Sequence, residues 1–561
     1  MELKKSSWPQ LISFVWVSLF IFTLSGVTLI TFSLRRLIYR VEFNIRSFLI
    51  RDMSLGFSLD WVRKLFLVLV LSITASVFFY CWSYINPETN IWRFTFLVVV
   101  FVVRIIILIT GSSLRSLILG WDGLGLRSYY LVVYYQNFKS NLSGFITVVS
   151  NRIGDVFIIL FILIILLNGL SRFWFKEAYD FTYCSIISIV ILFRAITKRA
   201  LFPYCTWLPE AIAAPTPVSS LVHSSTLVTA GIYILLRYVS ALTIETLFIF
   251  SIISAFTLII SSAAAVFCQD FKKVIALSTL SQLAFIGLVL SIGIPTLAFF
   301  HLITHAIFKS CLFIGAGSLL HLAQSNQDIR WRTNYKLSWG NNAAIIIPII
   351  ALVALPFTSG YFSKELIILA GLSGPFTLGL AIVLLVGAIF TVVYRLRLIN
   401  NLSLVRSTTK IISIFEDFGR LVSVVSVIIL SLCGGWYLNQ SGFDWFTLSS
   451  RWVVLFLQSA FLGFIILWVR YVFVFKRRNS PFWSRFAFLA PFSSTEVGRT
   501  INIGRAIIYA WEAGWVEALG PIYVQKISQD FTRGVYLLSL INYKTLLGLF
   551  ATALIRTSLI V

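Results

Sequence analysis

The sequence contains no arrangement of cysteines that would bind a metal cluster or a haem. Its six cysteines are scattered, with no CxxC pair and no ferredoxin-like or haem-attachment spacing. There is also no GxGxxG segment after a strand-like run and no Walker motif. We therefore expect no metal, redox cofactor or nucleotide in this chain. The cysteines are Cys81, Cys184, Cys205, Cys268, Cys311 and Cys433.

Acidic residues are also scarce, since 21 Asp and Glu stand against 45 Lys and Arg, for a formal net charge of +24. In a soluble protein this balance would suggest a nucleic-acid partner. Here the cations cluster in connectors between apolar runs, as at Lys476, Arg477 and Arg478. Cations in such places orient membrane spans and meet anionic lipids or acidic partner subunits. We expect membrane lipids and protein subunits as partners, and no nucleic acid.

Hydrophobic residues, in contrast, make up 59% of the 561 residues, which is more than a soluble core can hide. Runs of roughly 20 apolar residues, the length that spans a bilayer, recur along the sequence. They predict an all-α polytopic membrane protein with about 15–16 transmembrane helices. Clear examples are 11–31, 142–167, 247–266, 274–292, 377–393, 453–474 and 538–559.

The spacing of the apolar runs divides the chain into three parts. Residues 1–476 alternate long runs with short polar connectors, which predicts a single helix bundle. Residues 477–537 mix charged and apolar residues and predict an interfacial, lateral amphipathic segment. Within it, a helix over roughly 520–537 is expected to lie along the membrane plane. Residues 538–561 are expected to form a final transmembrane helix.

Prolines interrupt two of the apolar stretches at membrane depth. They lie between Pro203 and Pro217, in LFPYCTWLPEAIAAPTP, and at Pro356, in ALPFTSGYFSK. Paired interruptions are typical of transporters built from two related halves. Lys198 precedes the first break and Lys364 follows the second, an order that suits two inverted-repeat halves. We expect broken helices at both places, with the freed backbone groups facing polar protein or water.

Several ionisable residues lie within apolar runs, where each costs roughly 2.5–3.5 kcal/mol on insertion scales and is therefore a functional candidate. Asp122 lies in LILGWDGLGLRSYYLVVYY, where glycines at 120, 123 and 125 permit close backbone approach. A carboxylate at a helix end is the alternative. Arg152 and Asp155 are three residues apart and so share a helix face. They form either an ordinary structural ion pair or a pair that tunes a nearby acid.

Lys198 follows about ten mostly apolar residues in SIISIVILFRAITKRALF. Burial disfavours the charged form of a lysine, so that it can release and recapture a proton near neutral pH. The alternative is that Lys198 extends to the membrane surface together with Arg194 and Arg199. The break that follows Lys198 favours a functional role.

His301, His305 and Lys309, in HLITHAIFKSCLF, fall at i, i+4 and i+8 and form one polar stripe of a helix. Histidine titrates near physiological pH, and a series of His and Lys groups at this spacing can relay protons through intervening waters. A metal site would need more ligands than these. The remaining alternative is a pair of histidines that only packs.

Residues in three further segments complete the candidate set. His223 lies among hydroxyls in PTPVSSLVHSSTLV, where it is either structural or part of the relay. Lys272 and Lys273 open the run VIALSTLSQLAFIG and are either boundary cations or relay residues. Lys364 and Glu365 follow the second break, where they offer a terminal proton donor and its countercharge.

Six segments, in this order, resemble the antiporter-like membrane subunits of respiratory complex I, and most of all those of the chain 5 type. The similarity covers roughly residues 55–400. The segments are GWDGLGLRSYYL, NRIGDVF, TWLPEAIAAPTPVSSLVHSSTLVTAG, QDFKKVIALSTLSQL, HLITHAIFKSCLF and LPFTSGYFSKELI.

The resemblance implies a hydrophilic axis along the membrane midplane. Asp122 stands where the family has a glutamate, Glu365 where an aspartate is common, and Cys205 where a histidine or polar residue is expected. The Met-Gly-Gly segment usual after NQDIR is replaced by WRTNYKLSWG. The residues implied to form the axis or to tune it are Asp122, Arg152, Asp155, Lys198, His223, Lys272, His301, His305, Lys309, Lys364 and Glu365.

The family also implies a function. The chain would be a proton-translocating subunit of NADH:ubiquinone oxidoreductase, driven by quinone reduction in partner subunits that hold flavin, iron-sulfur clusters and ubiquinone. Its partners would be other membrane-arm subunits, especially antiporter-like subunits 4 and 2, along which the tail would lie. The start MELKKSSWPQ shows no cleavage site or presequence, which fits the mitochondrial inner membrane or, alternatively, a bacterial plasma membrane. A multisubunit Na+/H+ antiporter subunit and a proton-silent scaffold are the rival interpretations.

Overall fold

The chain divides into two compact units, 1–489 and 490–561, which we describe separately. Most of the described residues belong to the first unit. The computed structural model describes residues 18, 20–21, 23–26, 39–44, 54–85, 90–167, 181–322, 327–328, 339–355, 358–373, 378–403, 418–440, 502, 505, 523–539 and 543–558.

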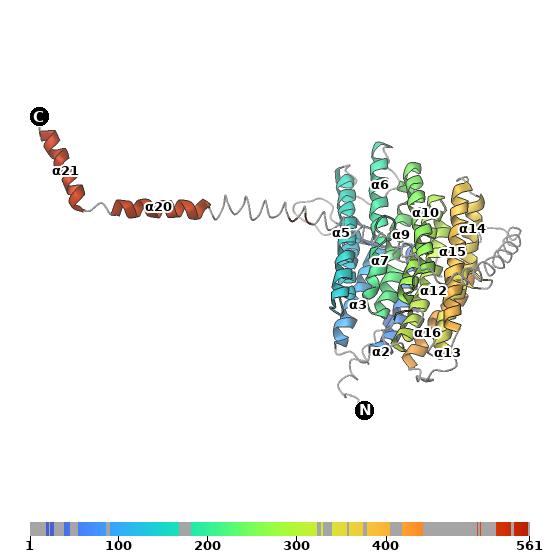
Figure 1. Cartoon of the computed structure of the whole chain (residues 1–561). Coiled ribbons are helices and arrows are strands. Elements are labelled where there is room, and N and C mark those ends of the chain that lie inside the picture. Colours follow the sequence, from blue (N-terminus) through green and yellow to red (C-terminus); the bar gives the residue numbers. More distant parts are fainter. Residues whose placement is uncertain are drawn as a thin grey trace, which may run out of the picture. The chain divides into compact units, whose positions relative to one another are not determined.

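Long helices form the first unit (Figure 1). The described residues contain eight helices that are long and apolar enough to cross a membrane, which confirms the predicted polytopic helical class. The total of about 15–16 spans stays a prediction, because 453–474 and most of 11–31 lie outside the described residues. The longer helices of this unit are α2 (Trp61–Tyr84), α3 (Ile91–Thr110), α4 (Leu114–Val132), α5 (Phe138–Leu167), α6 (Phe181–Lys198), α9 (Leu227–Arg237), α10 (Ile244–Phe267), α11 (Phe271–Ser291), α12 (Pro295–Leu322), α13 (Trp339–Val353), α14 (Ser359–Ser373), α15 (Leu378–Ser403) and α16 (Phe418–Gln440).

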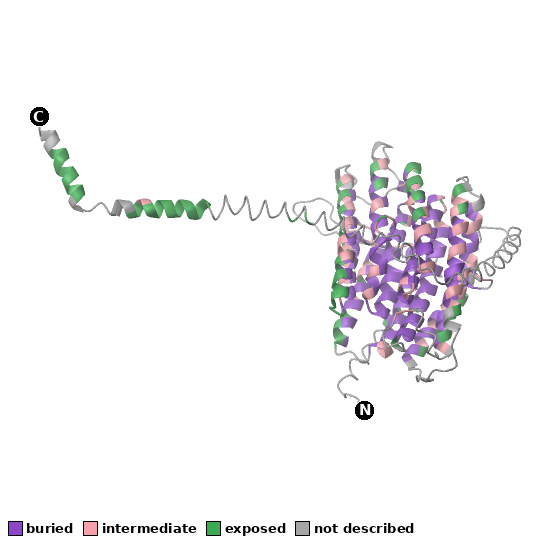
Figure 2. Cartoon of the chain, in the orientation of Figure 1, coloured by how far each residue is buried: buried purple, intermediate pink, exposed green. Residues whose placement is uncertain are grey.

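Helix α12 lies at the centre of this bundle, where it packs against α2, α11, α13, α14 and α16. The apolar stretches of α11 and α12 are buried along their whole length, whereas most of α5 is not. Figure 2 shows the same contrast between the buried interior and the exposed outer side of α5. A helix that is apolar all round belongs inside a bundle. The helix that carries His301, His305 and Lys309 is therefore surrounded by protein.

The first predicted break is present, and it begins before Pro203. Helix α6 ends at Lys198, and Ala200 has a φ of 55°, which a right-handed helix does not adopt, so the chain has left the helix before it reaches Pro203. The chain re-forms helical structure in short pieces before α9. These pieces are α7 (Trp207–Glu210), η1 (Ala211–Ala213), α8 (Thr216–Val218) and the π-helix η2 (Ser219–Thr226). A further short turn, η3 (Val239–Ala241), follows α9.

Buried side chains satisfy backbone carbonyls that this break leaves free. The Trp207 indole N–H donates to the carbonyl of Thr197 at 3.0 Å. The Lys272 ammonium donates to the carbonyl of Ala214 at 3.4 Å. Both acceptors face polar groups of the protein, as expected for non-helical backbone at membrane depth.

The second break separates α13 from α14. Helix α13 ends at Val353, and Ala354 has a φ of 68°, which no helix residue adopts. Helix α14 starts at Ser359, so Lys364 lies in a new helix, as predicted, while Pro356 itself lies outside the described residues. A Cβ on Gly360 would collide with the Ala351 carbonyl. The first turn of α14 therefore sits directly against the last turn of α13.

The all-α class holds for the bundle, and the described residues add one short β-hairpin that the sequence analysis did not predict. Strands β1 (Tyr39–Asn44) and β2 (Ser54–Leu59) form an antiparallel hairpin. In this hairpin Tyr39 pairs with Leu59, and Asn44 pairs with Ser54. The segments YRVEFN and SLGFSL alternate apolar and polar residues with the period of a strand. A search for long apolar runs, which identifies membrane spans, does not detect an alternation of only six residues.

The second unit contains α20 (Tyr523–Ser539) and α21 (Tyr543–Ser558). Helix α20 overlaps the predicted helix at 520–537 from Tyr523 onward and continues past the expected boundary to Ser539. Helix α21 starts after the predicted start at 538, and its apolar part, Thr545–Leu554, is short. The in-plane orientation stays a prediction, and nearly all of 477–522 lies outside the described residues.

Candidate functional site

Most of the predicted site residues lie inside the bundle. Eight of the eleven are buried, although several carry a formal charge. They come from α6, η2, α11, α12 and α14, which are far apart in the sequence. The eight are Lys198, His223, Lys272, His301, His305, Lys309, Lys364 and Glu365.

The other three residues form an ion-pair cluster on α4 and α5. Arg152 Nη1 lies 2.8 Å from Asp122 Oδ1 and 3.2 Å from Asp155 Oδ2. The side chains of Arg152 and Asp122 are 46% and 44% exposed, whereas that of Asp155 is 13% exposed. Asp122 is therefore half-exposed in this chain, where the ion pair with Arg152 balances its charge.

Lys198, at the end of α6, is held by Trp121 rather than by an acid. Its ammonium donates to the Trp121 carbonyl at 2.8 Å and lies 3.7 Å from the centroid of the indole ring. The Arg194 guanidinium lies 4.5 Å from the same ring. Trp121 thus stabilises two buried cations by cation–π contacts. Within the described residues Lys198 makes no ion pair. The residue that accepts its hydrogen bond, Trp121, directly precedes Asp122 in the sequence.

The middle of the bundle holds His223, Lys272 and Lys309. His223 lies in the π-helix η2, with its ring 6.3 Å from that of Trp207. Neither of its ring nitrogens has a hydrogen-bond partner among the described residues. The Lys309 ammonium donates to the Ser278 hydroxyl on α11. Single-turn π segments are frequent at functional sites, and this one presents a buried, unpartnered imidazole.

Hydrogen bonds join α12 to α11 and α14 around His301. Its Nδ1 lies 2.9 Å from Ser363 Oγ, and its Nε2 lies 3.3 Å from Gln282 Oε1. The Thr304 hydroxyl lies 3.1 Å from Ser363 Oγ. The rings of His301 and His305 are 6.3 Å apart, and neither nitrogen of His305 has a partner among the described residues.

Lys364 continues this cluster toward α15. Its ammonium donates to the Thr391 hydroxyl at 3.0 Å and lies 5.7 Å from the centroid of the Phe285 ring. Glu365, the next residue, is also buried. The predicted residues His301 and Lys309 of α12 and Lys364 of α14 thus each contact a hydroxyl group on a neighbouring helix.

Arg395 is a site residue that the sequence analysis missed. It is fully buried one helical turn after Thr391, and it interacts electrostatically with Lys364 and His301. Its Nη2 donates to the Tyr394 hydroxyl at 3.1 Å, whereas Nε and Nη1 have no partner among the described residues. The available signal was its position after a long apolar run in AIVLLVGAIFTVVYRLRL.

The buried charges are nearly all positive. Among the described residues Glu365 is the only buried acid. A lysine can become neutral by releasing a proton, whereas an arginine keeps its charge. The buried lysines and histidines are therefore the groups whose charge can change. No group of three or more His, Cys, Asp or Glu side chains that could hold a metal ion occurs in the part of the chain that the structure describes.

Comparison with known proteins places this site in a family. Residues 111–391 match the family model described as NADH:quinone oxidoreductase/Mrp antiporter, TM. The chain is 39% identical over 500 residues to NADH-ubiquinone oxidoreductase chain 5 of Mytilus edulis, covering 83% of this chain and 85% of the mussel protein. The chain belongs to the NADH-ubiquinone oxidoreductase chain 5 family. Chain 5 of Aedes aegypti is 34% identical over 557 residues, which cover 94% of this chain and 95% of the mosquito protein.

Solved structures show the same fold. A chain in the structure of the Mrp complex from Dietzia sp. DQ12-45-1b superposes with a TM-score of 0.73 at 21% identity, covering 94% of this chain and 60% of that chain. A chain of the membrane-bound sulfane sulfur reductase, an archaeal respiratory membrane complex, gives a TM-score of 0.66 at 17% identity, covering 82% and 93% of the two chains. At these identities the likeness concerns the fold alone. The chain 5 relatives therefore decide the family.

Proposed function

We propose that this chain translocates protons as a membrane-arm subunit of NADH:ubiquinone oxidoreductase, in the mitochondrial inner membrane. The observation that carries the proposal is the series of buried lysines and histidines. It extends from Lys198 on α6, held by a carbonyl group, to Lys364 on α14, held by a hydroxyl group. Such groups in a membrane protein are retained for function, because they cost free energy to insert.

His301 illustrates how one member of the series can take up and release a proton. The Gln282 carbonyl oxygen accepts, so Nε2 of neutral His301 carries the hydrogen, and Nδ1 accepts from the Ser363 hydroxyl. A proton can bind at Nδ1 once the Ser363 O–H turns away. The Gly360 carbonyl, 3.4 Å from Ser363 Oγ, offers that hydroxyl another acceptor. Rotation of a single hydroxyl thus accompanies each change in the charge of His301.

The relay needs water between its members. No hydrogen bond joins His301 to His305 among the described residues, and their ring centroids are 6.3 Å apart. A bridging water is enthalpically nearly as good as a direct hydrogen bond. Water between the two rings would complete the relay at this point. In our proposal, the supply of water and the charge of neighbouring lysines together control whether a proton moves.

In this proposal the chain holds no redox centre. Flavin, iron-sulfur clusters and ubiquinone belong to partner subunits, and this chain contributes to the reaction only by moving protons. The scattered cysteines support this assignment, since they offer no ferredoxin-like or haem-attachment spacing.

The partners in this proposal are other membrane-arm subunits, especially antiporter-like subunits 4 and 2. The exposed ion pair of Asp122 and Arg152 lies among exposed apolar side chains such as Leu126, Val156 and Ile159. A charged pair facing lipid tails is costly, so a polar partner surface is the favourable cover for this side of α4 and α5. The tail helix α20 supplies a second contact, as argued in the Discussion.

Two substitutions of Lys364 in the assembled complex test this function. Lys364→Met removes the charge, whereas Lys364→Arg keeps the charge but cannot release a proton. We expect both variants to assemble and to oxidise NADH when the membrane is uncoupled, and both to move fewer protons per NADH. Proton uptake into sealed vesicles, measured with a pH-sensitive dye, gives this ratio. A normal ratio in the arginine variant would show that Lys364 supplies only a fixed charge, and would contradict the relay.

A further inference from the structure

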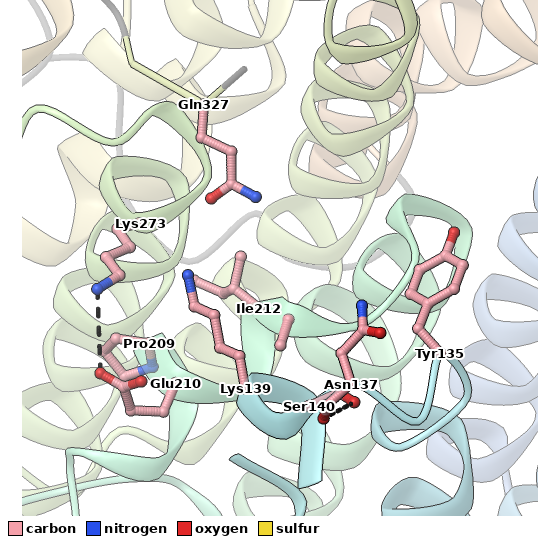
Figure 3. A pocket seen from close by; sticks show the side chains of 10 residues that line it. Tyr135, Asn137, Lys139, Ser140, Pro209, Glu210, Ile212, Lys273 and Gln327 are labelled. Carbon is pink, nitrogen blue, oxygen red and sulfur yellow. Dashed lines mark hydrogen bonds and ion pairs between the residues drawn. The ribbon is translucent and has the colours of Figure 1, made fainter. Parts of the chain in front are cut away.

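A polar cavity opens at the end of the bundle where α5 and α11 begin (Figure 3). Its volume of about 120 Å³ is enough for several water molecules. Charged residues from three elements line it, namely Lys139 of α5, Glu210 of α7 and Lys273 of α11. None of the eleven predicted site residues lines this cavity.

Glu210 is the acidic group of the cavity lining. Its carboxylate lies 4.0 Å from the Lys273 ammonium, which also lies 3.8 Å from Asp270 Oδ2. The Glu210 and Lys273 side chains are 30% and 33% exposed, so both reach water. Figure 3 shows Lys139 extending toward Ile212 on the opposite wall. The cavity therefore holds a carboxylate that is accessible to water and lies beside the Lys273 ammonium, with Lys139 also in the lining.

The wall of the cavity is the short segment that follows the first helix break. Glu210, Ile212 and Ala213 line the cavity on one side of this segment. The next residue, Ala214, accepts a hydrogen bond from the buried ammonium of Lys272 at 3.4 Å. Lys272 and Lys273 are neighbours in the sequence, yet Lys273 faces the cavity and Lys272 faces the interior. A single stretch of backbone, poor in bulky side chains, thus separates the cavity from the buried series.

We propose that protons pass between the aqueous phase and the buried series at this cavity, and that Glu210 carries them. The proposal rests on the function proposed above and names a further residue for it. A proton from water binds the Glu210 carboxylate. The resulting carboxylic acid gives the proton to water in the cavity, and the proton then passes the backbone segment that ends at Ala214 to reach Lys272 in its neutral form, which becomes an ammonium group. The carboxylate re-forms, and no electron moves.

The first test compares three variants in the assembled complex. Glu210→Gln keeps the size of the side chain but cannot carry a proton, and Lys272→Met removes the next group in the path. We expect both to lower the number of protons moved per NADH by the same amount, and Glu210→Asp to restore most of the loss. Glu245→Gln is the matched control, because Glu245 is an exposed acid in the first turn of α10 and does not line the cavity. It is expected to leave the ratio unchanged.

The outcomes separate the two proposals. If Lys272→Met lowers the ratio and Glu210→Gln does not, the role of Glu210 is wrong and the proposed function stands. If neither variant lowers it in fully assembled complexes, the proposed function itself fails. Assembly of each variant is checked on native gels. If Glu210→Gln does not assemble, the proposal is tested instead by measuring whether water-soluble reagents reach the cavity. A cysteine at Ala213 is then expected to react with a charged thiol reagent at least ten times faster than one at the buried Ala284, and equal rates would overturn the proposal.

Discussion

The buried arginines and lysines of this bundle are held in different ways. The Arg194 guanidinium stacks on the Trp121 ring, and that of Arg395 lies 5.3 Å from the Tyr394 ring. Lys198 and Lys364 instead donate short hydrogen bonds to a carbonyl and a hydroxyl. An arginine keeps its charge, so these guanidinium groups supply a constant positive potential. Each lysine that takes up a proton does so against that potential, which makes its charge state sensitive to small changes nearby.

The substitution Arg395→Gln tests whether the constant charge of an arginine controls proton release from Lys364. Removing the constant charge stabilises the protonated form of Lys364, so that release of the proton becomes slower. We expect the rate of proton pumping to fall roughly tenfold, which corresponds to about 1.4 kcal/mol. Replacing a buried charge that has no acidic partner is often neutral for stability, so assembly should remain normal.

The control for this prediction is Arg395→Lys, which keeps a positive charge at the same place. It is expected to retain more pumping than the glutamine variant. Both rates are measured in sealed vesicles at equal NADH oxidation. Unchanged pumping in Arg395→Gln would show that the guanidinium has no influence on the neighbouring lysine and histidines.

The sequence identifies the buried lysines and histidines because each interrupts an apolar run. It does not identify Arg395, because two arginines near the end of such a run usually extend to the membrane surface. It also does not identify Ser363 and Thr391, since only tertiary packing decides which hydroxyl meets a histidine or lysine. Nor does it give the exposure of Asp122, because helical periodicity shows which residues share a face, but not which face a partner covers.

At the scale of elements, the close contact of α3 and α4 positions the first half of the site. A Cβ on Gly120 would lie 2.6 Å from Leu108 Cβ and 2.7 Å from Leu108 Cα. Only glycine permits so close an approach. The next residue, Trp121, provides the carbonyl and ring that hold Lys198. The predicted close approach is thus confirmed at Gly120, whereas the nearest atom to a Cβ on Gly125 is 3.8 Å away.

Gly120→Ala should therefore destabilise the chain, and Gly125→Ala should not. The added methyl at position 120 pushes α4 away from Leu108, at a cost of about 1–3 kcal/mol, as for other overpacked sites. We expect a lower temperature of thermal inactivation for the complex and slower pumping, since Trp121 moves with α4. Equal inactivation temperatures for the two variants would mean that α3 and α4 adjust without strain.

The breaks in α6 and α13 show what sequence predicts at this scale. The prolines indicate the region of each break, but not the residue at which the helix ends, which is marked by a positive φ at Ala200 and at Ala354. Pro348, in contrast, lies inside α13. The hairpin of β1 and β2 is different. Its six-residue strands carry the alternation of a sheet, but this signal is weak beside the long apolar runs that dominate the chain.

At the scale of the whole molecule, the relay and the tail belong to different compact units. All eleven predicted site residues fall in the unit 1–489, whereas α20 and α21 belong to 490–561. The apolar residues Val524, Ile527, Phe531 and Val535 follow helical spacing along one side of α20, and all four are exposed. Such a stripe fits a membrane surface or the flank of a neighbouring subunit. Helices α20 and α21 therefore have the features of a clamp, and no charged residue described in them is buried.

Truncation of the chain after Gly520 distinguishes a clamp from a driving element. Without α20 and α21 the exposed apolar stripe is lost, so fewer complexes should retain the distal membrane arm, and total pumping should fall in proportion. The complexes that do assemble keep all the buried lysines and histidines, and should therefore move the normal number of protons per NADH. Native gels measure the assembled fraction, and vesicles made from purified intact complexes give the ratio. Replacing Ile527 and Phe531 together by serine is the matched variant, because it removes the apolar stripe while keeping the helix in place. Full assembly with a reduced ratio in either variant would contradict the clamp and would assign the tail a direct part in coupling.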